Sequence, residues 1–595
     1  MGQAEESARF RARYGLEHPD WFQDRVDDLT LEIRQVSIKG DRSINIVPSG
    51  VTAIVGANNV GKSLFLRELH GFLQRDPLQP DDPARRKIIE AVALETNGDL
   101  PEMFNWLLQQ GSIAEISESD LGIAVTSGPI HPNTAAAYWN SRDTGSLGSL
   151  AHSLVAFQGA QERLGLVSAA EKRERPTSPA THPLHRFEDH PEELQELNFI
   201  VQEIFGEQVQ LDTLGRVVEL RVGRVNVPAP PVDAITRSYV DAMTGLPLAQ
   251  SQGDGMRSML GLLLALMASP ARVFMIDEPE AFLHPPQAQR LGSVLGRLAR
   301  LRGVQVIVST HDRNLLAGVL SSDATVSVIR LGREGNQART QQLALEDVGK
   351  LWADPVLRYT NVLDALFHRL VVLCEAESDC QFYASAWDAL QDRGSRPQAD
   401  VLFAPTNGKG AMPKIARMLR AVKVPVVCIA DLDLLRQEGQ IKDLVEAMGG
   451  EWSALQSLYV GVTDGVSSLE SGSTCSEVLD SISASLSESL DARFDRYHRA
   501  QLSKLIGQAI SPWQQVKSQG LTALPKAQQQ SGDTLLSILD QIGIVLVREG
   551  TLERLAPEIS VKKGPKWARR AIKSGASKGP SAQTLMRRVL ASSET

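Results

Sequence analysis

The stretch VTAIVGANNVGKSLFLREL, residues 51–69, decides the fold of the first half of the chain. An apolar run is followed by a loop with the pattern G-x-x-x-x-G-K-[ST] and then by a helix-forming segment. Backbone N–H groups of such a loop turn toward phosphates, and the positive end of the helix adds to the attraction. The stretch therefore predicts a nucleotide-binding loop, with a chance glycine-rich turn as the alternative. The candidate nucleotide-binding residues are Gly56, Asn58, Asn59, Gly61, Lys62 and Ser63, and Ser63 is also a candidate Mg²⁺ ligand.

A second apolar stretch, RVFMIDEP, supports this prediction because it ends in two acids. An apolar strand does not end in two carboxylates without a cation or a polar partner nearby. We expect Asp277 to hold Mg²⁺ and Glu278 to orient the water that attacks the nucleotide. His311, after VQVIVST, is a candidate catalytic sensor of the γ-phosphate, and a structural role is the alternative. Gln158, in FQG, is a further candidate for contact with the nucleotide site.

Four acids at the ends of two other apolar stretches predict a second site. Glu375 and Asp379 follow RLVVLC, and Asp431 and Asp433 end VPVVCIADLD. We expect the first pair to share one face of a helix and the second pair to point the same way along an extended segment. Such carboxylates repel one another unless divalent metal lies between them, and oxygen donors without His or Cys suit Mg²⁺ or Mn²⁺. The pattern suits phosphodiester cleavage in which one ion activates water and another stabilises the leaving oxygen; solvated acidic turns are the alternative.

Length and composition limit the class of protein. The 595 residues are too many for one core, since domains mostly hold roughly 100–200 residues. Hydrophobic residues make up 42% and charged residues 22%, and the net charge of −9 excludes a uniformly basic coat for nucleic acid. The 4 cysteines contain no CxxC pair, and no apolar stretch has the length of a signal peptide or a membrane span. We therefore expect a cytoplasmic protein without membrane association.

The pattern of strands and helices breaks after about residue 350 and predicts two main α/β domains. The expected ranges are a first domain over 1–350 with an irregular insertion over 72–150 and a helical region over 170–240, and a second domain over 365–595 with a helical insertion over 465–545 and a basic tail over 561–595. The tail has nine basic residues against Glu594, a net charge of 9 − 1 = +8. This charge suits a phosphate backbone, and Trp567 among the lysines favours contact with nucleic acid. A solvated disordered end is the alternative.

Taken together, the first set of motifs resembles the ABC-type ATPase head of SMC and RecF-like proteins. In that resemblance SQGDGMRS, residues 251–258, stands where the signature loop stands, so Ser251 and Gly253 are candidate nucleotide-binding residues. Gln252 and Asp254 replace the small residues usual in that loop. Such heads clamp ATP between two subunits, which implies a homodimer or a higher even oligomer, with 170–240 as a dimerisation region. The long coiled coil of SMC proteins is absent.

The second set of acids resembles a TOPRIM domain, whose pattern is a Glu after the first strand and Asp-x-Asp after a later one. TNGKG matches the glycine-containing turn between them, and Ala376 replaces a usual Gly. An ABC-type ATPase followed by TOPRIM is the layout of the OLD (overcoming lysogenization defect) family nucleases, to which the Gabija anti-phage nuclease subunit is related. The implied fold is α/β: an N-terminal ABC/SMC-like P-loop ATPase head, then a C-terminal TOPRIM domain with a helical insertion.

The same resemblance implies further site residues. Glu375 and Asp431 become catalytic as well as metal-binding, and Glu553 in EGTLERL becomes a further metal ligand. The family has a catalytic lysine shortly after this segment. The three lysines that compete for the role are Lys562, Lys563 and Lys566, of which Lys562 is the first.

The resemblance implies an ATP-regulated, metal-dependent endonuclease that cleaves DNA in anti-phage defence, with ATP and Mg²⁺ or Mn²⁺ as cofactors. One alternative is an ATPase switch or scaffold subunit of a defence complex with an inactive TOPRIM-like domain. Another is a TOPRIM nuclease acting on RNA such as tRNA. Retention of all four acids favours an active domain, and a second defence-system subunit could be a partner. The absence of a zinc-binding cysteine set disfavours a primase.

Overall fold

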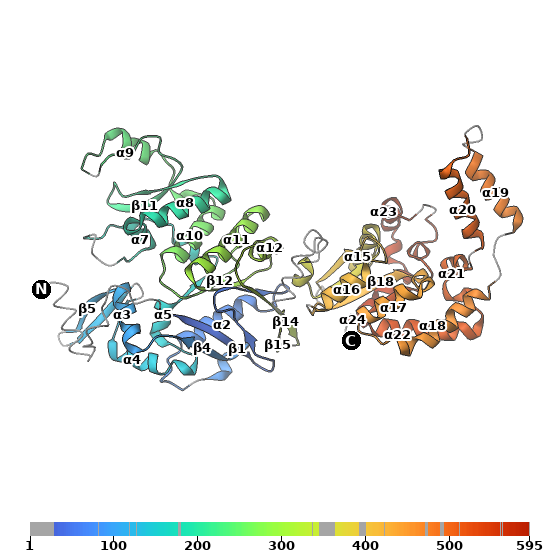
Figure 1. Cartoon of the computed structure of the whole chain (residues 1–595), viewed down its shortest axis with the longest axis horizontal. Helices are drawn as coiled ribbons and strands as arrows, with labels where there is room; N and C mark the ends of the chain where they lie inside the picture. Colours follow the sequence, from blue (N-terminus) through green and yellow to red (C-terminus); the bar gives the residue numbers. More distant parts are fainter. Residues whose placement is uncertain are drawn as a thin grey trace. The chain divides into compact units, whose positions relative to one another are not determined.

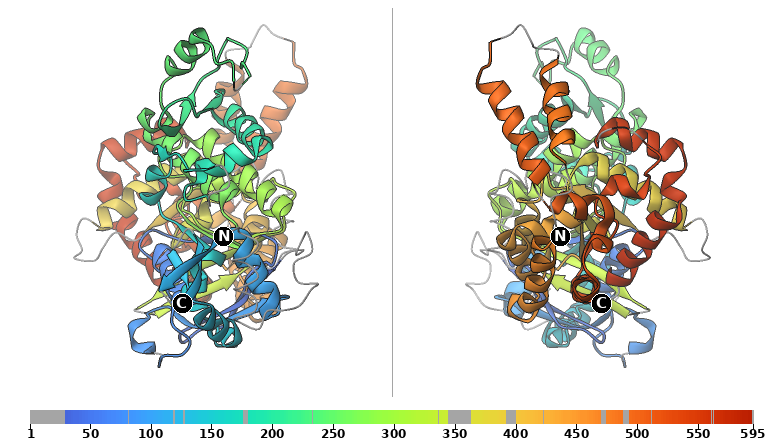
Figure 2. Two further views of the ribbon diagram at one scale, coloured as in Figure 1. Left: turned by 90° about the vertical axis from the view of Figure 1, so that its left-hand side faces the viewer. Right: turned by 90° about the vertical axis from the view of Figure 1, so that its right-hand side faces the viewer.

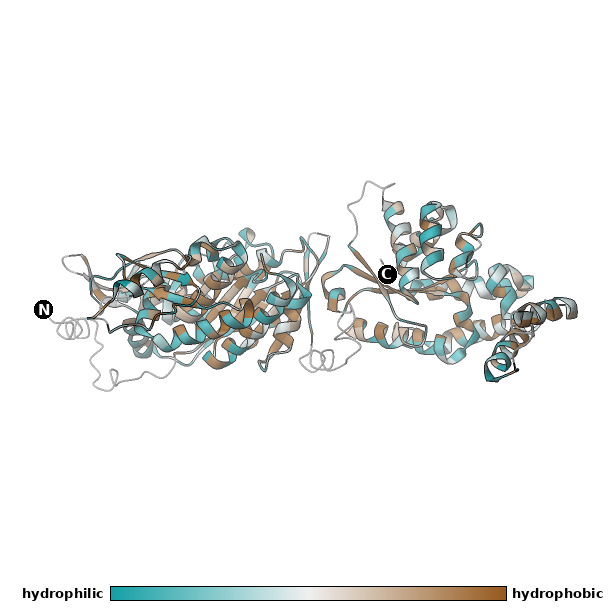
Figure 3. Ribbon diagram, turned by 90° about the horizontal axis from the view of Figure 1, so that it is seen from above, coloured by the Kyte–Doolittle hydropathy of each residue, from teal (hydrophilic) through white to brown (hydrophobic). Residues whose placement is uncertain are grey.

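The computed structural model divides the chain into two compact units, Met1–Arg358 and Tyr359–Thr595 (Figures 1 and 2). In each unit apolar strands lie among helices (Figure 3). The described residues are 29–593 except 81, 118–119, 126–127, 176–179, 232, 336, 344–362, 392–399, 422, 470–473, 488–492, 511, 560 and 562. None of the helices that they form is long and apolar enough to cross a membrane.

A mostly parallel six-stranded sheet forms the centre of the first unit, in the order β15-β14-β3-β13-β12-β8. Every residue of β3 and of β13 is buried, as expected for inner strands covered on both faces. The strand β3, which leads into the glycine-rich loop, pairs with one side of β13, and β12 pairs with the other side. The bounds are β3 Gly50–Val55, β8 Val155–Gln158, β12 Val273–Asp277, β13 Gln305–Ser309, β14 Val326–Glu334 and β15 Gln337–Gln342.

Helices cover this sheet and bring the loops to one edge. The helix α10, Asp254–Ala268, is buried along its length from Ser258 to Met267, because its residues are apolar almost all round. The glycine-rich loop leads directly into α2, and α11 and α12 pack against each other. The bounds of these helices are α2 Lys62–Gln74, α11 Pro285–Arg302 and α12 Arg313–Leu320.

A buried side chain joins a second, antiparallel sheet, in the order β2-β1-β4, to the central one; β1 is Leu31–Ile38 and β2 is Ile44–Asn45. The Gln305 amide accepts a hydrogen bond from Ile33 N at 2.9 Å and donates to Ile33 O at 2.9 Å and to Val47 O at 2.7 Å. Gln305 begins β13 and is 1% exposed. One polar side chain therefore satisfies backbone groups that water cannot reach.

The expectation of an irregular insertion over 72–150 was wrong. This range holds regular elements, and the strand β4 pairs with β1, Leu31–Ile38, along seven residue pairs. The carboxylate of Glu68 accepts hydrogen bonds from the N–H groups of residues 87, 88 and 89 and so fixes the start of β4. The bounds are β4 Ile89–Thr96, α3 Leu100–Gln110, β5 Ser112–Ser117, β6 Asp120–Val125, β7 Gly128–Ile130 and α4 Pro132–Asn140.

The range 170–240, expected to be helical, combines helices with a small antiparallel sheet in the order β10-β11-β9. The pairing of Leu211 with Leu220 joins its two longer strands. The bounds are β9 Ala170–Glu171, α7 Pro183–Asp189, α8 Pro191–Phe205, β10 Val209–Asp212, β11 Val217–Val222 and α9 Arg237–Thr244.

The second unit is built on a parallel four-stranded sheet in the order β17-β16-β18-β19. The central strands β16 and β18 are buried at every residue. Helices α15, Glu377–Gln391, and α16, Met412–Ala421, follow β16 and β17. The strand bounds are β16 Leu370–Cys374, β17 Val401–Pro405, β18 Val426–Asp431 and β19 Ile544–Val547.

Between β18 and β19, the described residues form the short helix α17, Glu438–Ala447, and then five further α-helices. The pair α19 and α20 lies side by side (Figure 2). The bounds are α18 Trp452–Ser467, α19 Cys475–Leu486, α20 Arg496–Ile510, α21 Trp513–Gln519 and α22 Lys526–Gln541.

The basic tail is folded, against the alternative of a disordered end. Its helices α23, Pro565–Lys573, and α24, Pro580–Ser593, pack on α15. The inference that Trp567 contacts nucleic acid was wrong, because its ring is 0% exposed and lies 5.2 Å from the Phe382 ring in the core. The guanidinium of Arg588 donates to both Asp540 oxygens, at 2.9 and 2.7 Å, so part of the positive charge stabilises the fold.

Gln305→Ala tests the connection between the two sheets of the first unit. The substitution leaves the backbone groups of Ile33 and Val47 buried without their partner, so we expect the unfolding free energy of that unit to fall by about 2–4 kcal/mol. Gln337→Ala, at an exposed position of β15, is the control. Thermal unfolding measures both variants, and equal midpoints would contradict the role assigned to Gln305.

Candidate nucleotide and metal sites

The glycine-rich loop leaves β3 and enters α2 in the geometry that phosphate binding requires. Asn59 and Gly61 have positive φ angles of 61° and 104°, which turn successive backbone N–H groups to one side. At Gly56 (φ 147°) an added Cβ would lie 2.2 Å from Leu331 O, so only glycine fits. Lys62 is 7% exposed, and its ammonium group donates to Gly56 O at 2.8 Å and to Ala57 O at 3.0 Å. Lys62 thus lies folded over its own loop, whereas Asn58 is exposed and Ser63 half-buried at the start of α2.

The acids of RVFMIDEP lie across β13 from this loop. Asp277 ends β12 opposite Ser309, and Ser309 is in turn opposite Ile54 of β3. The Ser309 hydroxyl donates to the Asp277 carboxylate. Glu278 follows with a φ of 45°, a strained conformation for a residue with a side chain, and its N–H donates to Ser309 O at 3.0 Å. The fold therefore places both acids at the carboxyl edge that carries the glycine-rich loop.

His311 lies between two carboxylates after β13. Its Nδ1 is 3.3 Å from Glu278 Oε1 and 3.6 Å from Glu280 Oε1. Glu280 is 6% exposed and accepts hydrogen bonds from Thr310 Oγ1 at 2.6 Å and His311 N at 3.1 Å. Burial raises the pKa of Glu280 in spite of these hydrogen bonds. The position of His311 is thus set by a buried acid that motif analysis did not select, although it lies in the same DEPE segment.

Arg163 is a second residue that the motifs did not reveal. Its guanidinium donates to Asp277 O at 3.0 Å and to Glu278 O at 2.9 Å and so supports the turn that presents both acids. The side chain is 0% exposed, and burial lowers its pKa to about 10 although nearby carboxylates oppose the shift. Gln158 ends β8 beside β12, and its Oε1 is buried and accepts no hydrogen bond from the described part of the chain.

Ser251 and Gly253 lie at the entrance to α10. The Ser251 hydroxyl is used locally, donating to Leu248 O at 2.7 Å, and Gly253 is the residue before the helix. A Cβ at Gly255 would lie 2.6 Å from Phe282 O, so the start of α10 packs against the loop that follows Glu278. Contact of Ser251 and Gly253 with nucleotide stays a prediction.

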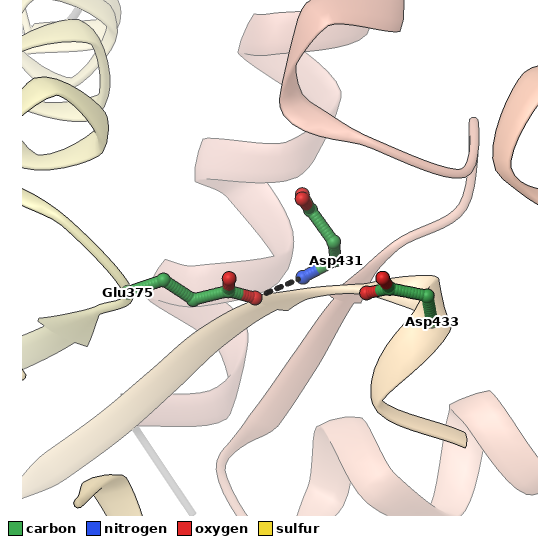
Figure 4. A group of neighbouring side chains, drawn as sticks. All are labelled: Glu375, Asp431 and Asp433. Carbon is green, nitrogen blue, oxygen red and sulfur yellow. Dashed lines mark hydrogen bonds between the residues drawn. The ribbon is translucent and has the colours of Figure 1, made fainter. Parts of the chain in front are cut away.

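Three of the four expected metal-binding acids converge at the carboxyl edge of the second sheet (Figure 4). One oxygen each of Glu375, Asp431 and Asp433 lies within 4.8 Å of the other two. Glu375 Oε1 also accepts a hydrogen bond from Asp431 N at 3.0 Å. Oxygen donors at this spacing fit a divalent cation of the Mg²⁺ or Mn²⁺ type.

The local geometry of these acids differs from the sequence-based expectation. Glu375 and Asp379 do not share a helix face, because α15 begins at Glu377, after Glu375. Asp431 ends β18, whereas Asp433 belongs to a 3₁₀ turn, Leu432–Arg436, and not to an extended segment. The turn, and not strand alternation, brings Asp433 back to the cluster.

Asp379 belongs to the same site through a lysine. Lys563 Nζ lies 2.8 Å from Asp431 Oδ2 and 3.3 Å from Asp379 Oδ2, and Asp379 is 2% exposed. Burial and repulsion by Asp431 raise the pKa of Glu375, and burial raises the pKa of Asp379. Burial tends to lower the pKa of Lys563, but the surrounding carboxylates outweigh it and raise that pKa. The carboxylates grouped at the carboxyl edge of the second sheet thus favour a positive charge there.

Of the two competing lysines that the structure describes, Lys563 contacts the acids and Lys566 is exposed, whereas Lys562 lies outside the described residues. Glu553 lies in the 3₁₀ turn Leu552–Leu555 after β19, and its Oε2 is buried and accepts no hydrogen bond from the described residues. The described acids that lie within 4.8 Å of one another do not include Glu553, and its ligand role stays a prediction.

Two further lysines on Asp433 were missed by sequence reasoning. Lys409, in the TNGKG turn, pairs with Asp433 Oδ1 and lies 3.6 Å from Glu375 Oε1. Lys517, in α21, lies 2.5 Å from Asp433 Oδ2. The turn around Lys409 was visible as a motif, but no pattern in the sequence identifies Lys517.

Comparisons with known proteins support this division into two sites. The family model "AAA domain, putative AbiEii toxin, Type IV TA system" matches residues 162–317, which include Arg163, Asp277 and His311. The model "Overcoming lysogenization defect protein-like, TOPRIM domain" matches residues 366–433, which include Glu375 and Asp433. A search of curated proteins finds no match.

Two solved structures similar to the chain are SMC heads. The SMC head bound to the C-terminal winged-helix domain of ScpA is 13% identical, covers 53% of this chain and 99% of its own, and has a TM-score of 0.33. The SMC head domain from Thermotoga maritima is 14% identical, covers 53% of this chain and 99% of its own, and has a TM-score of 0.29. The chain therefore joins an N-terminal unit matched by an AAA-domain model to a C-terminal unit matched by an OLD-like TOPRIM-domain model.

Proposed function

We propose that the protein is an ATP-regulated, divalent-metal-dependent endonuclease that cleaves DNA by a two-metal TOPRIM mechanism in anti-phage defence. The observation that carries the proposal is the convergence of Glu375, Asp431 and Asp433 within 4.8 Å, with Asp379 linked to them through Lys563. An inactive scaffold has no need to hold buried acids against their mutual repulsion, so this arrangement favours cleavage. The protein acts in the cytoplasm, alone or with a second defence-system subunit.

The four acids and Glu553 would hold the metal, and bound divalent ions supply an activated water and charge stabilisation at the leaving oxygen. The chain's own residues fix where this happens. The Asp431 carboxylate is oriented by Leu552 N, which donates to its Oδ1 at 2.9 Å. Lys563 keeps its proton because carboxylates surround it, and so presents a fixed positive charge toward a phosphate oxygen.

The ATPase residues have separate roles. Lys62 and the loop N–H groups would bind the phosphates, and Ser63 and Asp277 would hold Mg²⁺. Glu278 would orient the attacking water, and His311, held against both Glu278 and Glu280, would contact the γ-phosphate. Gln158, Ser251 and Gly253 complete the proposed nucleotide site, the last two from a second subunit.

Near-isosteric changes of the acids test the nuclease site. Glu375→Gln can keep the hydrogen bond from Asp431 N, and Asp431→Asn can keep the one from Leu552 N but loses the one from Lys563. Each variant removes a charge, so we expect cleavage to fall by roughly 10²–10³-fold or more. Metal-free Glu375→Gln should melt no lower than wild type, because its repulsion with Asp431 is relieved. Mn²⁺ should raise the melting temperature of wild type and not of Asp431→Asn, since only the folded site binds the ion.

The measurement uses plasmid DNA and tRNA, each with Mg²⁺ or Mn²⁺ and with or without ATP. Asp388→Ala, an exposed acid of the same helix as Asp379, is the control and should cut at the wild-type rate. Cleavage of tRNA alone would identify RNA as the substrate. Wild-type rates in both Glu375→Gln and Asp431→Asn would exclude a TOPRIM nuclease and leave the scaffold alternative.

Lys62→Ala tests the nucleotide site. The variant loses a charge-assisted contact with phosphate, which is worth about 1.5–3 kcal/mol, so we expect ATP affinity to fall by roughly tenfold or more. Lys87→Ala, at an exposed lysine, is the control. Fluorescence of a labelled ATP analogue measures binding, and the effect on DNA cleavage shows whether ATP activates or restrains the nuclease. Unchanged affinity would contradict the assigned loop.

The proposed sharing of nucleotide between subunits predicts a homodimer or a higher even oligomer. Glu278→Gln should accumulate this assembly with ATP, because the variant binds nucleotide but lacks the carboxylate that orients water. Light scattering with and without ATP measures the mass. A monomer under every condition would show that Ser251 and Gly253 do not complete a second subunit's site.

A further inference from the structure

The helical region between β18 and β19 contributes a residue to the TOPRIM site. Lys517 belongs to α21, outside the residues 366–433 matched by the TOPRIM family model. Its ammonium group lies 2.5 Å from Asp433 Oδ2, and Lys409 pairs with the other oxygen of the same carboxylate. Asp433 therefore holds two ammonium groups, one from the TNGKG turn and one from the helical insertion.

Lys517 is held in place by close packing and is not an ordinary surface lysine. A Cβ at Gly550 (φ 110°) would lie 2.4 Å from Lys517 O, and a Cβ at Gly520 (φ 65°) would lie 2.0 Å from Arg548 O. Neither position accepts a side chain, so α21 and its following turn lie directly against the loop after β19. Arg554, in the 3₁₀ turn that follows β19, also donates from Nε to Ser518 O of α21 at 2.5 Å, so this turn too contacts α21.

The lysines are also open enough to meet a ligand. The side chains of Lys409 and Lys517 are 20% and 34% exposed, whereas that of Asp433 is 15% exposed. When Asp433 serves as a metal ligand, its charge is no longer fully available to two ammonium groups. Each ammonium group then needs a new anion, and the phosphates of a nucleic acid bound at this edge are the anions that approach it.

We propose that Lys517, together with Lys409, binds the phosphate backbone of the nucleic acid at the TOPRIM site, so that the helical insertion is part of the substrate-binding surface. This inference rests on the proposed nuclease function and adds a substrate-binding residue to it. The guanidinium of arginine can make the same contact with phosphate, whereas the neutral side chain of methionine has a similar length and cannot.

The test measures DNA binding by Lys517→Met, with Lys517→Arg as the conservative variant and Lys442→Met, at an exposed lysine of α17, as the control. Each is made in a Glu375→Gln background to limit cleavage, and fluorescence anisotropy of a labelled duplex oligonucleotide with Mn²⁺ is recorded at several salt concentrations. We expect Lys517→Met to weaken binding by roughly tenfold. The slope of log K against log salt should become shallower by about 0.9, the value for one lost phosphate contact on duplex DNA.

A second measurement separates substrate binding from a structural role. Mn²⁺ affinity of the free protein, followed by calorimetry, should be unchanged or tighter in Lys517→Met, because a cation that competes for Asp433 is removed. Lys517→Arg should restore the slope, and Lys442→Met should leave it unchanged. An unchanged slope, or a loss of Mn²⁺ binding together with a lower melting temperature, would overturn the proposal.

The outcomes also separate this inference from the nuclease proposal. Wild-type protein that binds DNA with a Lys517-dependent slope but cuts no nucleic acid would overturn the nuclease function and leave Lys517 as a phosphate-binding residue. Wild-type protein that cuts DNA at a rate and with a salt dependence that Lys517→Met does not alter would overturn only the role of Lys517.

Discussion

Repulsion between carboxylates held at one edge of a parallel sheet is the constraint on which the TOPRIM unit depends. The carboxyl ends of β16 and β18 place Glu375 and Asp431 together, and the turn after β18 adds Asp433. Such a cluster is stable only if positive charge reaches it. The lysines that do so come from three separate parts of the chain: a turn after β17, the helix α21 and the segment before α23. The insertion and the tail thus each supply a positive charge to this edge of the sheet.

The ATPase unit meets a similar constraint in another way. Asp277, Glu278 and Glu280 lie in one short segment. The buried Arg163 donates to the backbone carbonyls of Asp277 and Glu278. The carboxylates accept hydrogen bonds from hydroxyl and backbone N–H groups, and the His311 ring lies close to Glu278. The acids therefore stay available at the edge where the glycine-rich loop also ends, as binding of a nucleotide with its metal ion requires.

The sequence revealed the parts of the fold that depend on local pattern. Apolar runs that end in glycine or acids predicted β3, β12, β13, β16 and β18 and the site residues at their ends, because burial and chemistry coincide there. It did not reveal β4, whose partner β1 lies far away in the sequence and whose start is fixed by a side chain of α2. Nor did it reveal Arg163, Glu280 or Lys517, since each acts through a tertiary contact. Trp567 was misread because the nearby lysines suggested contact with nucleic acid, whereas α23 buries Trp567 on one face.

The contact between Lys563 and Asp431 joins residues 132 positions apart. During synthesis the strands β16 and β18 leave the ribosome well before this lysine, and domains generally fold as units. The acidic edge then exists without Lys563, and without the helices α23 and α24 that complete the core around Trp567. The acidic edge is therefore among the last parts of the second unit to be completed, so a chain that ends within the helical insertion retains Lys409 but lacks Lys563 as a counter-charge.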